Sequence, residues 1–127
     1  MAGIGSGPWG YYTVNGVNYK NISVVTTSSA GSAWAFAETD VVPTNRAVTT
    51  GWISANARLF DASGNLVLES GFQTNPGTIR ANGVWDVFSP YRNATGSFRS
   101  WGVSKAWNGA TYIAYYASQS SLLSTGT

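Results

Sequence analysis

The fold class is decided by residues 51–70, GWISANARLFDASGNLVLES. From Ile53 to Leu59, small or apolar side chains alternate with polar ones, which is the two-residue period of a half-buried β-strand. Residues 61–65 have the composition of a tight turn, because Asp61 can cap the bend and Gly64 can adopt a positive φ. Residues 66–68 begin a return strand. This stretch therefore predicts a β-hairpin.

Two Asn-Gly pairs predict further hairpins, since Asn and Gly tolerate the positive φ that a type I′ turn requires. Asn15-Gly16 separates expected strands at 9–14 and 17–27, and Asn108-Gly109 separates expected strands at 97–105 and 111–118. Two more strands are expected at residues 33–38 and 84–89. Residues 41–45 are expected to be a crossing segment outside the strands, because Pro43 cannot donate to a sheet ladder.

Turn signals recur roughly every eight to twelve residues, a spacing typical of sandwiches and barrels. The sequence therefore predicts an all-β fold: a single-domain antiparallel β-sandwich or small β-barrel of about eight strands. Residues 9–118 are expected to form the domain. Residues 1–8 are expected to be a flexible lead that looks like a mature N-terminus, and residues 119–127 a polar tail.

Charge is scarce in this chain of 127 residues: 43% of the residues are hydrophobic, 9% are charged and the net charge is +2. Ser, Thr, Asn and Gly therefore supply the solubility, which is typical of secreted, extracellular β proteins. The basic residues are scattered, with only a loose group at Arg92, Arg99 and Lys105. Nucleic-acid binding needs clustered positive charge, so we predict no nucleic-acid partner.

Cysteine and histidine are both absent from the sequence. Their absence removes disulfides, thiolate nucleophiles, serine–histidine and cysteine–histidine catalysis, and nearly all zinc, copper and iron sites. We therefore predict no cofactor, no metal site and no catalytic residue. The sequence also has no run of about 18 apolar residues, so no transmembrane helix is expected.

The carboxylates are the remaining candidates for catalysis, and five are present: Glu38, Asp40, Asp61, Glu69 and Asp86. A glycosidase needs two carboxylates that face each other across a sugar. Strand pairing could join Glu38 or Glu69 with Asp86. Asp61 is explained by its turn, and Asp40 offers one calcium ligand without the dense oxygen pattern that calcium needs.

Aromatic residues are abundant, with six Trp and seven Tyr. Exposed rings near loops form flat apolar surfaces that suit sugars, interfacial lipid or protein partners. Trp34, Trp52 and Trp101 lie inside expected strands and are expected in the core. The ligand-binding candidates lie at the first hairpin or near loops and strand ends: Trp9, Tyr11, Tyr12, Tyr19, Trp85, Tyr91 and Trp107.

Three runs carry a resemblance to a known group: VNGVNYKNIS at 14–23, GWISANARLFDASGNLV at 51–67 and WGVSKAWNGATYIAYY at 101–116. Over most of its length the chain resembles small secreted proteins of Gram-positive bacteria, chiefly actinobacteria, whose function is not established. The resemblance implies export and a bacterial source. Because its motifs are turns and strands, it transfers no site residue.

Three function classes fit the sequence. The favoured class is a secreted, non-enzymatic binding module that recognises a glycan, a cell surface or a protein partner through aromatic-rich loops. The second class is a small pore-forming or membrane-acting antibacterial toxin, and the third is a carboxylate-based glycoside hydrolase. A membrane partner and a homo-oligomer are left open, since exposed strand edges can pair and little charge is present to block them.

Overall fold

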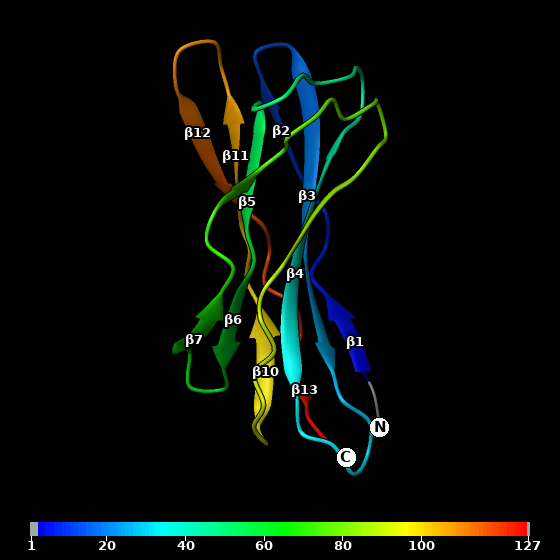
Figure 1. The fold of residues 1–127 in the computed structure, drawn as a ribbon, viewed down its shortest axis with the longest axis vertical. Coiled ribbons are helices and arrows are strands. Elements are labelled where there is room, and N and C mark those ends of the chain that lie inside the picture. The colour runs from blue at the N-terminus through cyan, green and yellow to red at the C-terminus, as the bar shows by residue number, and fades with distance from the viewer. Residues whose placement is uncertain (1–2, 127) are drawn as a thin grey trace.

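A computed structural model describes residues 3–126, and in this range the chain is all-β, with thirteen strands and no helix (Figure 1). The sheets are antiparallel and do not close into a barrel. Residues 1–2 and 127, at the outer ends of the expected lead and tail, lie outside the described residues. Since the described chain contains no helix, it also contains none that could cross a membrane.

The first layer is one sheet built around the longest strand. Its five strands are β1 (Gly3–Ser6), β2 (Gly10–Val14), β3 (Val17–Thr27), β4 (Ala35–Pro43) and β9 (Trp85–Phe88). Strand β4 pairs with β3 along its whole length, and β9 pairs with the other edge of β4. On the far side of β3, strand β2 pairs with residues 17–21 and β1 with residues 24–27. The order across the layer is therefore β1 and β2, then β3, β4 and β9.

The second layer consists of two four-stranded sheets placed end to end. One contains β13 (Leu123–Ser124), β10 (Ser97–Ser100), β6 (Arg58–Asp61) and β7 (Leu66–Glu69), in that order. The other contains β12 (Tyr112–Tyr116), β11 (Val103–Trp107), β5 (Ile53–Asn56) and β8 (Gln73–Thr74). Figure 1 shows β6, β7, β10 and β13 at the end of the molecule near β1, and β12, β11, β5 and β2 at the opposite end.

The two layers contact each other through their apolar faces. Strands β4, β5, β6 and β10 supply many of the contacts between the layers. The core is made mainly of small and branched side chains, including Val25, Ala37, Ile53 and Leu59, all fully buried. This arrangement is consistent with a β-sandwich.

The structure confirms the all-β class, and it corrects the strand number of about eight to thirteen in the described range. Two expected strands are interrupted: the 53–59 strand divides at Ala57 into β5 and β6, and the 97–105 strand divides at Trp101 and Gly102 into β10 and β11. The remaining additions are short strands that complete sheet edges. Such interruptions depend on contacts between layers, which the alternation of side chains does not encode.

The chain ends also differ from the expected flexible lead and polar tail. Strand β1 pairs with the part of β3 that β2 leaves uncovered, and β13 pairs with β10. A Cβ atom placed on Gly3 would lie 3.1 Å from the Leu123 side chain, so the two ends also pack together. Pairing with otherwise open strand edges satisfies backbone groups at both ends.

Pro43 was expected to exclude residues 41–45 from a strand, whereas β4 continues to Pro43. The amide N–H of Thr44 points to β3 and donates to the Asn18 carbonyl at 2.7 Å. Successive amides alternate in direction, so the nitrogen of Pro43 faces the other side, where the pairing of β9 has already ended at Val41. The missing donor therefore costs no ladder hydrogen bond.

The layers are in close contact where β10 passes into β11. The amide of Gly102 donates to Ser23 Oγ on β3 at 2.8 Å, and a Cβ atom on Gly102 would overlap the Oγ1 of Thr39 on β4 and lie 2.7 Å from its Cγ2. Thr39 Oγ1 in turn donates to the Asn56 carbonyl at 3.2 Å. Only glycine fits at position 102 without moving β4.

We predict that Gly102→Ala lowers the free energy of unfolding by about 1–3 kcal/mol, because the added methyl group must push Thr39 and its strand aside. Gly77→Ala is the matched control, since nothing lies within 4 Å of a Cβ atom there. Urea unfolding of both variants measures the difference. Equal stability of the two variants would contradict the close approach.

Candidate functional site

The outer face of the first layer is organised by the alternation of side chains along β4. Ala35, Ala37 and Thr39 point into the core and are fully buried, whereas Phe36 and the acidic residues after it are partly exposed. The burial pattern of β9 is similar, with Val87 buried between exposed neighbours. Adjacent strands therefore present an aromatic end and an acidic end on one solvent-facing surface.

The aromatic end is a cluster of four rings, here called the aromatic platform: Trp34, Phe36, Phe88 and Tyr91. Tyr91 lies 5.1 Å from Trp34 and 5.0 Å from Phe36, measured between ring centroids. Phe36 lies 6.0 Å from Trp34 and 6.1 Å from Phe88. Phe88 is 48% exposed and Tyr91 is 54% exposed, so the platform offers apolar surface to solvent.

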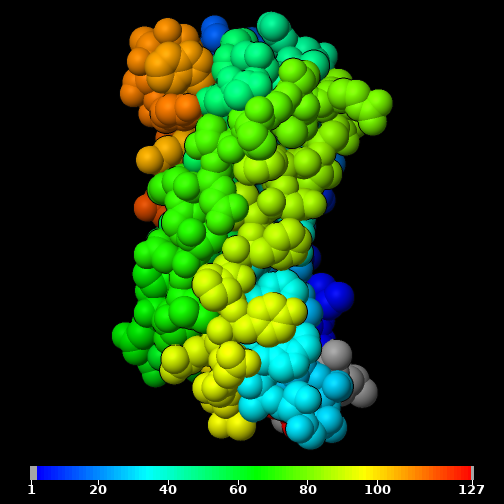
Figure 2. Space-filling view, viewed as in Figure 1, coloured from blue at the N-terminus to red at the C-terminus, as the bar shows by residue number. Residues whose placement is uncertain are grey.

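The loop after β9 is fixed against the start of β4 by backbone hydrogen bonds. Ala35 and Arg92 exchange two of them, at 3.0 and 2.7 Å, and the Ala37 amide donates to Ser89 Oγ at 2.9 Å. In the space-filling view, the yellow segment after β9 lies directly against the cyan segment that leads into β4 (Figure 2). Hydrogen bonds at Ser89 and Arg92, on either side of Tyr91, therefore fix the backbone that carries the Tyr91 ring.

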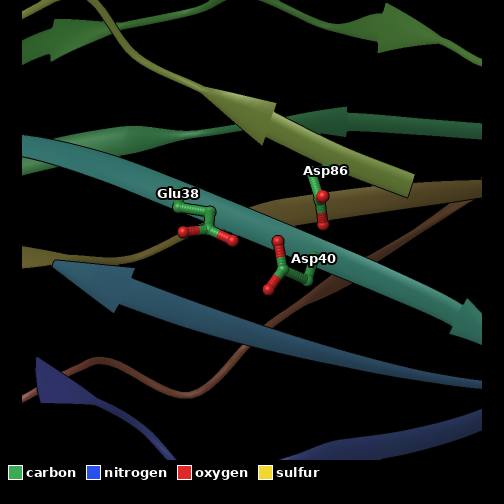
Figure 3. Close-up of side chains that lie close together, drawn as sticks. All are labelled: Glu38, Asp40 and Asp86. Atoms are coloured by element: carbon green, nitrogen blue, oxygen red, sulfur yellow. The ribbon is translucent and has the colours of Figure 1, made fainter. Parts of the chain in front are cut away.

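The acidic end is a cluster of three carboxyl groups, here called the acidic cluster: Glu38, Asp40 and Asp86. One oxygen from each residue lies within 4.8 Å of the other two. Asp40 and Asp86 are directly opposite each other in the register of β4 and β9, and Glu38 is two residues away on the same face. Figure 3 shows the carboxyl groups of Glu38 and Asp40 converging, with Asp86 beside Asp40.

Asp40 is a member of the acidic cluster whose pKa is shifted from its ordinary value. Burial, together with the neighbouring carboxyls of Glu38 and Asp86, raises the pKa of Asp40 from 3.8 to about 9. Its Oδ1 atom is buried and has no hydrogen-bond partner. At neutral pH the cluster therefore holds a neutral Asp40 carboxyl beside its two acidic neighbours.

Four of the seven basic side chains lie over aromatic rings: Lys20, Arg46, Arg58 and Lys105. The Lys20 amine lies 4.3 Å from the Trp9 ring centroid and the Lys105 amine 3.9 Å from that of Phe72. The guanidinium of Arg58 lies within 5.2 Å of three ring centroids. Every interaction that shifts the pKa of Asp40 raises it, so none of these cations stabilises the ionised form of Asp40.

Three carboxylates are also oxygen ligands of the kind that calcium prefers, although calcium takes about six to eight such ligands. The cluster supplies one oxygen from each of three residues, which is fewer than calcium takes. We therefore assign no metal to it. The carboxyl oxygens lie within 4.8 Å of one another, which is close to the separation of about 5–5.5 Å between the two carboxyl groups of a retaining glycosidase.

The ligand-binding candidates at the first hairpin lie in different surroundings. Tyr11 is 74% exposed, and Trp9 lies beneath the Lys20 amine. Tyr12 stacks between Tyr19 at 5.3 Å and Tyr115 at 4.1 Å, with its hydroxyl 2.7 Å from Ser104 Oγ. The Tyr19 side chain is 1% exposed and packs in the core, and with Tyr11 and Tyr12 it lines a pocket of about 340 Å³.

The other three candidates lie apart from this hairpin. Tyr91 belongs to the aromatic platform. Trp85 is partly buried against the core, and its indole N–H donates to the Gln73 carbonyl at 3.0 Å. Trp107 packs edge-on against Tyr112 at 5.1 Å. The structure therefore brings Tyr11, Tyr12 and Tyr19 together at one pocket, whereas Trp85, Tyr91 and Trp107 do not line it.

Sequence reasoning placed Tyr91 among the binding residues but missed its partners. Trp34 was expected in the core, and Phe36 and Phe88 were not candidates. A Glu38–Asp86 pair was considered from the sequence, and the structure brings these two residues together. Asp40, which lies with them, was treated separately. A Glu69–Asp86 pair is not formed within the acidic cluster, because Glu69 lies in the other layer and accepts a hydrogen bond from Asn56 at 2.6 Å. The sequence signal for this surface was the alternation of Trp34, Phe36, Glu38 and Asp40, which places them on one strand face.

Comparison with known proteins adds no family to this picture. No protein-family model matches the chain, and no curated protein matches it. A solved structure described as "X-ray structure of Northeast Structural Genomics Consortium target SoR45" is 9% identical, with 100% of this chain and 86% of that chain covered at a TM-score of 0.36. A TM-score this low carries no argument, so the site is interpreted from its own geometry.

We predict that Asp40→Asn stabilises the protein increasingly as the pH rises from 4 to 8. The Asp40 carboxyl remains protonated up to about pH 9 in the folded state but ionises near 3.8 when unfolded, so wild-type stability from this group is present at low pH and lost as the pH rises. Asparagine does not titrate. Calorimetric melting temperatures at pH 4, 6 and 8 measure the effect, with a gain of several degrees expected at pH 8.

Asp61→Asn is the control with the opposite sign. Hydrogen bonds from the turn backbone, first that of Asn65, lower the pKa of the exposed Asp61 carboxyl, so this carboxylate stabilises the fold above its unfolded pKa and loses that effect on acidification. The substitution should therefore lower the melting temperature at pH 8 more than at low pH. The same pH profile for both variants would refute this account of the acidic cluster.

Proposed function

We propose that this protein is a secreted, non-enzymatic module of β-sandwich architecture that binds a neutral glycan on the outer face of its first layer. The observation that carries the proposal is the aromatic platform lying beside the acidic cluster on one exposed surface. Apolar ring faces and hydrogen-bonding carboxyls are the two kinds of group that sugar recognition requires.

The aromatic platform supplies the apolar half of this recognition. One face of a pyranose ring is lined with C–H groups, which pack against aromatic faces, and the partly exposed rings of Phe88 and Tyr91 are available for this contact. Their neighbours Trp34 and Phe36 hold them at ring separations of 5.0 to 6.1 Å. Little side-chain entropy is therefore lost when a sugar binds.

The acidic cluster supplies the polar half. Ionised carboxylates accept hydrogen bonds from sugar hydroxyl groups, and a protonated carboxyl can also donate one. Because its pKa is raised, the Asp40 carboxyl can supply the donor near neutral pH. The same negative charge disfavours acidic polysaccharides at this face, because their own carboxylates would be repelled.

We predict that Phe88→Ala weakens binding to an insoluble neutral polysaccharide about tenfold, since one exposed ring contact is removed. Co-sedimentation with cellulose, chitin, xylan and peptidoglycan measures the affinity. Phe72→Ala is the matched control: Phe72 is 43% exposed, close to the 48% of Phe88, but lies on the other layer beneath Lys105. Equal loss in both variants, or no retention of the wild type by any of these glycans, would reject the proposal.

The two other function classes stay predictions with direct tests. Turnover of a soluble glycan by the wild type, lost in Glu38→Gln, would replace the binding role with a carboxylate-based hydrolase. Dye release from liposomes, accompanied by ring-sized oligomers on sizing, would replace it with a membrane-acting toxin.

A further inference from the structure

A second candidate surface lies on the outer face of the other layer, near the basic residues Arg58 and Arg99. A cavity of about 280 Å³ lies there between the turn that joins β6 to β7 and the strand β10. Phe60 and Trp101 form its aromatic wall, with ring centroids 5.8 Å apart, and Arg99 and Gln119 form its polar wall. Arg99 is directly opposite Phe60 in the strand register, so both side chains project from the same face.

The guanidinium group of Arg99 lines the cavity and has donors available for a ligand. One of its terminal nitrogens donates to Gln119 Oε1 at 2.7 Å. A guanidinium has five N–H donors in a planar array, so donors remain for a second acceptor. No acidic side chain lines this cavity, and a planar carboxylate matches the geometry of the free donors.

A second guanidinium lies behind the aromatic wall. The Cζ atom of Arg58 is 5.1 Å from the ring centroids of both Phe60 and Trp101 and 5.2 Å from that of Tyr116. Its Nε donates to the Trp101 carbonyl at 2.9 Å, and its Nη2 atom is buried with no hydrogen-bond partner. Glu69 is directly opposite Arg58 in the strand register, so Arg99 is the cation that lines the cavity.

The carboxylate next to the cavity already accepts hydrogen bonds from the backbone. The carboxylate of Asp61, next to the cavity in the same turn, accepts backbone N–H bonds from Ser63 at 3.0 Å and Asn65 at 2.9 Å. Its charge is thus directed to the turn amides and leaves Arg99 without a carboxylate partner in the cavity. An anionic ligand in the cavity would therefore contact Arg99 without meeting an acidic side chain in the cavity lining.

The size of the cavity limits the ligand to a single ring. Sites for drug-sized ligands begin at about 300 Å³, so a volume of about 280 Å³ suits one sugar unit of a longer chain. We propose that this cavity binds a hexuronic acid residue, with the sugar ring against Trp101 and its carboxylate on Arg99. This site is independent of the neutral-glycan face, which lies on the other layer.

Isothermal titration of the full chain with a galacturonate trisaccharide, a neutral galactose trisaccharide and acetate tests the proposal. We expect binding of the galacturonate that weakens with added salt, and no measurable binding of the other two at this site. Arg99→Gln should weaken galacturonate binding at least about tenfold, because a charge-assisted bidentate contact is lost. Arg80→Gln is the matched control, since Arg80 is exposed and does not line the cavity.

Gln119→Ala provides a second variant at an exposed position, where loss of folding is not expected. Gln119 acts as a positioning residue for Arg99, so its loss should weaken galacturonate binding less than Arg99→Gln and leave the salt dependence in place. The proposal is overturned if Arg99→Gln binds galacturonate as the wild type does, if acetate binds equally well, or if galacturonate does not bind. The binding of neutral polysaccharides and its response to Phe88→Ala are unaffected by any of these results.

Discussion

The close approach of Gly102 to Ser23 and Thr39 is the constraint on which the rest of the structure depends. It joins the two layers at the point where β10 ends and β11 begins, and its hydrogen bond satisfies a backbone amide inside the molecule. The two short sheets of the second layer are thereby held against the two long strands β3 and β4. Because β4 is fixed on its inner side at Thr39, its outer side chains are presented in a defined arrangement.

Charge in this protein is distributed in an uncommon way for such a low charged fraction. Cations lie over aromatic rings, as Lys20, Arg58 and Lys105 do, while three carboxyls contact one another on the outer face of the first layer. Acidic and basic groups are thus gathered at different places on the surface, although the net charge is only +2. A fold with so little charge can still select ligands, because local position decides the electrostatic field that a ligand meets.

The fold was predictable to the extent that local pattern determines it. The Asn15-Gly16 turn, with φ of 52° and 76°, and the strand from Val17 to Thr27 were predicted from the sequence and are present. The candidate site was only partly predictable. Tyr91 and the Glu38–Asp86 pair were recognised, whereas Trp34 was assigned to the core, because alternation shows which residues share a face without showing whether that face is covered.

The sequence by itself determined the all-β class, the hairpin turns and the residues that share a strand face, since these depend on φ preferences and on the two-residue period of a strand. Only the tertiary structure decided which strands are neighbours and which faces remain exposed. Asp40 and Asp86 are forty-six positions apart and meet through strand register, and the ends of the chain pair with edges that distant strands leave open. Such contacts arise from packing between layers, which no local pattern of residues specifies.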